Sequence, residues 1–119
     1  MQGTSPRSDL EARTFRFAQE VRAFVRKLPR GIINSADGTQ LIRSSGSIGA
    51  NYIEAQEALS KKDFGMRAKI CRKEAKESNY WLGLLDEVPD SLRQQHTALL
   101  QESLELTKIF SAIVQKTRN

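Results

Sequence analysis

Apolar residues recur at steps of three and four along most of the chain, which is the spacing of one face of an α-helix. The clearest stripe predicts a helix from about Ser35 to Leu59 that passes without interruption through a run of very small residues. Its positions are Leu41, Ser45, Ile48 or Gly49, Tyr52, Ala55 and Leu59. We take this stripe as the centre of the fold.

The small residues on this stripe predict that two helix backbones approach each other closely. A glycine inside a helix costs roughly 1 kcal/mol relative to alanine, so tight packing against a neighbouring helix must offset that cost. The expected helix-packing residues are Ser45, Gly46, Ile48, Gly49, Ala50 and Tyr52. The alternative is a phosphate-binding glycine loop, but the stretch lacks both the GK[ST] ending and the GxGxxG spacing of such loops.

The same periodicity predicts three further helices. The first begins at Ser8 or Asp9 and ends before Pro29, with Ile32 and Ile33 in the following turn placed on the core. The third runs from about Lys61 to Glu87, capped by Ser60 with Asp63 at the N3 position. The fourth follows the helix-breaking VPDS segment and ends near Lys116.

These elements and their short connections predict an all-α, antiparallel up-down four-helix bundle. We expect a disordered lead over residues 1–8 and a single domain over residues 9–119. The composition leans to helix formers, and no segment has the pattern of a strand.

The third helix has more apolar surface than one core needs. Beside its core-facing seam, a second apolar line is formed by Met66, Ile70, Trp81 and Leu84. An exposed apolar line that contains tryptophan is typical of a partner surface, so these residues are the expected interface of a homo-oligomer.

The charge distribution of the chain bears on the kind of partner it could bind. The chain of 119 residues has 19 Lys and Arg against 14 Asp and Glu, a formal net charge of +5. The positive excess falls on the first and third helices, which indicates a polyanionic partner or simply a lysine-rich solvated face. The candidate nucleic-acid-binding residues are Arg13, Arg16, Arg22, Arg26, Lys61, Lys62, Arg67, Lys69, Arg72, Lys73 and Lys76. Few aromatic residues lie among them, so we expect contacts to the phosphate backbone and not to the bases.

The candidate catalytic groups are few. The single histidine, His96, falls on an inner face without a nucleophile partner, and the single cysteine, Cys71, reads as a small buried apolar residue. We therefore expect no metal site and no cofactor. The absence of a signal-like segment and of a long apolar run predicts a cytoplasmic protein.

Two ExxE pairs are the strongest enzyme hypothesis. Glu54 and Glu57 share one helical face and Glu74 and Glu77 share another, as in all-α nucleotide pyrophosphohydrolases that hold Mg²⁺ with four carboxylates. The alternative is that these carboxylates pair with neighbouring cations such as Arg43. We expect the second, and hence no enzymatic activity.

Three segments resemble a known family. DLEARTFRFAQEVRAFVRKLP, LIRSSGSIGANYIEAQEALSKKDF and KICRKEAKESNYWLGLLDE are similar to the four-helix-bundle proteins encoded in 23S rRNA intervening sequences. The resemblance implies a homopentamer and kinship with the accessory protein of diversity-generating retroelements, which works with a reverse transcriptase and RNA. It supplies no catalytic residues. The expected function is RNA or other nucleic-acid binding, with a protein-interaction scaffold as the alternative.

Overall fold

The computed structural model describes the backbone of residues 6–118 and the side chains of residues 9–118, and this part of the chain is all-α. The helices are α1 (Pro6–Arg26), α2 (Ile32–Gln56), α3 (Lys61–Leu84) and α4 (Arg93–Thr117), with a short 3-10 helix, η1 (Asp90–Leu92), before α4. Residues 6–118 contain no strand, as the composition predicts. None of these helices has the length and hydropathy to cross a bilayer.

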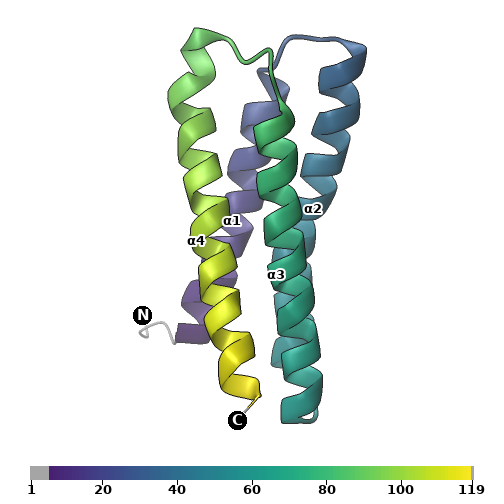
Figure 1. The fold of residues 1–119 in the computed structure, drawn as a ribbon, viewed down its shortest axis with the longest axis vertical. Helices are drawn as coiled ribbons and strands as arrows, with labels where there is room; N and C mark the ends of the chain where they lie inside the picture. Colours follow the sequence, from purple (N-terminus) through teal and green to yellow (C-terminus); the bar gives the residue numbers. More distant parts are fainter. Residues whose placement is uncertain (1–5, 119) are drawn as a thin grey trace.

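The helices lie side by side along the long axis of the molecule (Figure 1). The α1–α2 and α3–α4 connections lie at one end, and the α2–α3 turn lies at the other end. Helix α1 packs against α2 and α4, and so does α3. Helices α1 and α3 therefore occupy opposite corners, and their outward faces point away from each other.

The first helix begins at Pro6, where proline is well tolerated because the first turn needs no intrahelical donor. Of the expected disordered lead over residues 1–8, residues 6–8 belong to α1, and residues 1–5 lie outside the described part of the chain. The expectation that Ile32 and Ile33 pack on the core is wrong, since they are 87% and 62% exposed in the first turn of α2.

The second helix ends at Gln56, short of the expected Leu59, which is 97% exposed and not part of the inner face. The chain leaves the helix there, and Ser60 caps the start of α3 with an extended backbone. Its hydroxyl accepts a hydrogen bond from the Asp63 amide at 3.0 Å, which confirms the expected cap. The third helix ends at Leu84 because Leu85 has an extended backbone.

One continuous apolar core runs between the four helices. Its largest fully buried side chains include Phe17 and Phe24 from α1, Ile48 from α2, Leu82 from α3 and Phe110 from α4. Burial of each such side chain stabilises the fold by roughly 1.5–3 kcal/mol. The predicted stripes therefore meet in one interior, which fixes how each helix is rotated and which side chains it presents outward.

Helices α2 and α3 approach closely because small hydroxyl residues face each other between them. The Ser44 and Ser78 hydroxyls lie 2.9 Å apart, and the Ser78 hydroxyl also donates to the Glu74 carbonyl at 2.9 Å. All buried side-chain polar atoms of the described residues have a partner. The interior of this hairpin is therefore polar but satisfied, so its cost is small.

Candidate functional site

The glycine-serine run lies within α2, and its members face two different directions. Ser45, Ile48 and Tyr52 are buried in the core, while Gly46 and Gly49 are half-buried under α1. Ala50 is exposed and lines the outer side of the α1–α2 contact.

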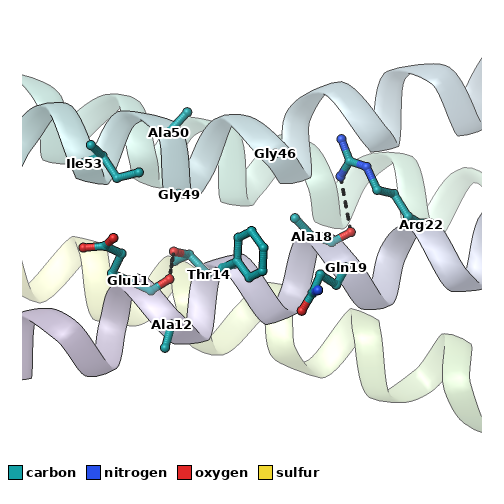
Figure 2. A pocket seen from close by; sticks show the side chains of 11 residues that line it. Glu11, Ala12, Thr14, Ala18, Gln19, Arg22, Gly46, Gly49, Ala50 and Ile53 are labelled. Atoms are coloured by element: carbon teal, nitrogen blue, oxygen red, sulfur yellow. Dashed lines mark hydrogen bonds between the residues drawn. The ribbon is translucent and has the colours of Figure 1, made fainter. Parts of the chain in front are cut away.

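Helices α1 and α2 pack tightly against each other at Gly49. A β-carbon at this position would lie 3.0 Å from the hydroxyl oxygen of Thr14. The same hydroxyl donates a hydrogen bond to the Glu11 carbonyl, also at 3.0 Å. At Gly46 the nearest atom is the Arg22 Nη2, at 3.6 Å. Arg22 is folded back along α1 and donates from Nη1 to the Ala18 carbonyl at 3.3 Å (Figure 2). At Gly49, therefore, α2 packs directly against α1 at Thr14, whereas at Gly46 only the flexible side chain of Arg22 lies against α2.

An apolar groove of about 660 Å³ runs along the outside of this α1–α2 contact (Figure 2). Its rims include two large exposed side chains, Phe15 at 64% and Ile53 at 47%. Sequence periodicity did not single out either residue. Phe15 could have been noticed, because it precedes the core residue Phe17 by two positions and so must lie on the opposite side of the helix.

The second apolar line of α3 lies on the side that faces α2. Met66 is 56% exposed and Leu84 45% exposed, whereas Ile70 and Trp81 are half-buried. Met66 and Ile70 line a shallow hollow between α2 and α3 together with Glu54 and Glu57. Part of the line thus remains open to solvent in the subunit.

The basic residues of α1 do not form one free surface. Arg13 is engaged within the subunit by Glu102 of α4, through contacts of 2.7 Å from Nε and 2.8 Å from Nη2. These bonds raise the pKa of Arg13. Arg22 lies in the groove, and Arg16 and Arg26 are exposed. One of the expected phosphate contacts is therefore already taken by a carboxylate.

The basic residues of α3 are better gathered. Lys62, Lys69 and Lys76 are all exposed and follow one another at intervals of seven residues, which places them on one line of the helix about 10 Å apart. Tyr80, 60% exposed, follows on the same side. We call these lysines the α3 ridge. The exposed Tyr80 was not expected to accompany it.

Four other candidate cations lie on α3 outside this line of lysines. Arg67 donates to the Asn51 side chain of α2 at 3.2 Å, and the Lys73 Nζ lies 4.0 Å from Glu74. Arg72 is half-buried, and Lys61 is exposed at the start of the helix. The α3 ridge is therefore the part of the predicted basic surface that the fold leaves most accessible.

The four candidate carboxylates do not converge. Arg43 donates to Glu74 at 3.3 Å and to Glu77 at 2.7 Å, and these contacts raise the pKa of the arginine. Glu54 and Glu57 lie in the hollow nearer the α2–α3 turn. Among the described residues, no group of three or more His, Cys, Asp or Glu side chains could hold a metal ion. The arrangement matches the ion-pair alternative for Glu74 and Glu77.

His96 and Cys71 both have structural surroundings. The His96 Nε2 lies 2.7 Å from the Leu82 carbonyl, and its ring stacks on Phe24 with centroids 5.6 Å apart. The Cys71 thiol is fully buried and donates to the Ile48 carbonyl at 3.5 Å; burial raises its pKa from 9.0 to about 12. A thiol with that pKa is a poor nucleophile near neutral pH.

The described residues form an all-α protein of four helices, and its candidate binding features, the groove and the α3 ridge, lie on the surface. Comparison with family models matches residues 8–112 to the 23S rRNA-intervening sequence protein family. The chain belongs to that family. Comparison with curated proteins gives no match.

A solved structure supports the same assignment. The chain is similar to a protein of unknown function from the S23 ribosomal protein family of Bacteroides thetaiotaomicron VPI-5482, with a TM-score of 0.76 and 28% sequence identity. The similarity covers 92% of this chain and 97% of that one. Neither comparison attaches a catalytic activity to the fold.

Proposed function

We propose that this protein is a non-enzymatic homo-oligomer of antiparallel up-down bundles, a pentamer by family resemblance, that binds RNA through the α3 ridge. The observation that supports binding is the exposed line of Lys62, Lys69 and Lys76. Each lysine that neutralises a phosphate releases counterions, so a row of them gives affinity without sequence preference.

The ridge suits a backbone-led contact. Lysine is a flexible point charge that reaches phosphates at varied angles, and the row follows a straight helix, so it can track one strand of a structured RNA. The ring of Tyr80 at the end of the row contacts Trp81 edge-to-face, with centroids 5.1 Å apart, but is exposed enough to meet an unpaired base. In an oligomer the ridge is repeated on every subunit, and this repetition multiplies a weak contact into useful avidity.

Helix α1 plays a lesser part in this proposal than its charge suggests. Arg13 is bound to Glu102, and α1 lies at the corner opposite α3, so one subunit cannot present both helices to the same stretch of RNA. Arg16 and Arg26 remain available for a second strand or a neighbouring region.

The test is a salt-titrated binding measurement with a structured RNA, comparing two triple variants of equal net charge. Changing Lys62, Lys69 and Lys76 to glutamine should weaken binding and reduce the slope of log affinity against log salt by about 2–3. The control changes the exposed Lys27, Lys108 and Lys116 to glutamine, and its slope should stay near that of the unchanged protein. Equal loss in both variants would show that only net charge matters and would refute the ridge.

The second candidate is a scaffold that binds a protein, such as a reverse transcriptase. It is favoured by the apolar groove at Phe15 and Ile53, which no other described residue covers. A pull-down that recovers a protein after nuclease treatment, and loses it on Phe15→Arg while the assembly keeps its mass, would favour this role over RNA binding.

A further inference from the structure

The groove between α1 and α2 is an open apolar surface, and the second apolar line of α3 exposes Met66 in a shallow hollow that it shares with Ile70 and with carboxylates of α2. We propose that they bind each other across subunits: the groove of one copy receives the Met66–Ile70 face of the next copy, in the same orientation. The inference rests on the proposed homo-oligomer and names its interface.

Contacts within the subunit place the two faces at the same height. Gly49 of α2 lies against Thr14 of α1, and the adjacent Ile48 accepts a hydrogen bond from Cys71 of α3. Phe15 and Ile70, next to Thr14 and Cys71, therefore lie within about one helical turn of each other along the bundle. If neighbouring copies stand in parallel, the exposed Phe15 ring meets Ile70 and Met66 without any sliding.

Charges match at a second height. The Arg22 guanidinium lies beside Gly46, one helical turn from Arg43 on α2. Arg43 in turn holds Glu77, whose side chain is 38% exposed on the α2 side of α3. In the same parallel register, Arg22 of one copy comes level with Glu77 of the next. Glu74 and Glu77 share Arg43, and the Lys73 Nζ also lies 4.0 Å from Glu74, so Glu77 is the carboxylate that a further guanidinium would pair with.

The geometry of the two faces also determines the form of the assembly. They are different surfaces, so the contact is head-to-tail, and both are built partly on α2. Each subunit is then a wedge with α2 along its inner edge, and identical wedges close into a ring. The α3 ridge lies on the outer side of α3 and stays exposed in such a ring.

Cross-linking with a short bis-maleimide tests this register in a Cys71→Ala background, which must itself assemble as the unchanged chain does. Ala12 on the groove and Met66 on α3 are both exposed and lie within about one turn in height. Neither Ala12→Cys nor Met66→Cys alone should cross-link. Co-expressed, the two single variants should give dimers, and the double variant should give a ladder of multimers.

Other outcomes are equally informative. Dimers from either single variant would mean that like faces meet, and would overturn the head-to-tail contact. A large mass by light scattering without cross-links in the double variant would overturn this interface and leave the homo-oligomer standing. A monomeric mass for the unchanged chain would remove both, while RNA binding remains measurable separately.

A substitution separates the interface from the fold. Phe15→Arg changes a side chain that is 64% exposed, so helicity should persist while the mass falls to that of one subunit. The matched control is Leu104→Arg, an exposed leucine on α4 outside both faces, which should leave the assembly unchanged. Loss of assembly in both variants, or in neither, would refute the assignment.

Discussion

The contact between α1 and α2 at Gly49 can be tested by adding a single methyl group at each of two glycines. Gly46 and Gly49 both lie inside α2, where alanine is more favourable than glycine by about 1 kcal/mol. If helix propensity alone mattered, both Gly46→Ala and Gly49→Ala would stabilise the protein by that amount. The neighbours of the two sites predict different results.

At Gly46 the added methyl meets only the flexible end of Arg22 at 3.6 Å, so most of the gain of about 1 kcal/mol should remain. At Gly49 it meets the Thr14 hydroxyl oxygen at 3.0 Å and the Thr14 β-carbon at 3.4 Å. Thr14 is buried and its hydroxyl is bound to the Glu11 carbonyl. Turning it away forfeits a hydrogen bond of about 1 kcal/mol, and moving the helices apart costs about 1–3 kcal/mol.

We therefore expect Gly49→Ala to lie about 1–2 kcal/mol below Gly46→Ala in the free energy of unfolding. The measurement is urea unfolding followed by circular dichroism, repeated at several protein concentrations so that association is separated from folding. A double-mutant cycle with Thr14→Ala should show a favourable coupling of about 1 kcal/mol for Gly49→Ala and almost none for Gly46→Ala. Equal stabilisation by the two substitutions, without coupling, would falsify the close approach of α1 and α2.

Three further predictions concern single side chains. Burial raises the pKa of the Cys71 thiol, so its contribution to stability is complete below pH 9 and is lost between pH 9 and about 12, because the thiol ionises first in the unfolded chain. The free energy of unfolding of the Cys71→Ala variant should therefore fall less over that pH range. An identical fall in both proteins would contradict the role of the buried thiol. His96→Ala should cost about 1–3 kcal/mol, because it removes the contact to the Leu82 carbonyl and a ring stack, and a neutral effect in urea unfolding would count against a structural role. Arg13→Ala should cost about 0.5–1 kcal/mol through Glu102, whereas Arg16→Ala should cost nothing measurable; reversal of that order in thermal melts would be inconsistent with the described ion pair.

Much of the fold follows from local rules that operate within one helix. Steps of three and four identified the stripe of α2, and the Ser60 cap marked the start of α3, because both depend only on residues a few positions apart. Helix ends were less accurate. Leu59 continues the stripe in sequence but falls after Gln56, where the chain leaves the helix to enter the cap of α3.

The candidate surfaces depended on contacts between helices, which a single stripe does not contain. Arg13 and Arg16 look alike in the sequence, yet only Arg13 has a carboxylate from α4 beside it. Glu74 and Glu77 share the spacing of Glu54 and Glu57, but Arg43 forms ion pairs only with Glu74 and Glu77. Partners distant in sequence decide which charges remain free.

The sequence by itself determined the four helices and most of their buried stripes, because backbone propensity and side-chain periodicity act over one or two turns. The tertiary structure decided that α1 and α3 stand at opposite corners, that the α3 lysines are exposed while Arg13 is paired with Glu102, and that Phe15 borders a groove along the α1–α2 contact. Those properties depend on how each helix is rotated about its axis, and that rotation is set by the packing of all four helices around one core.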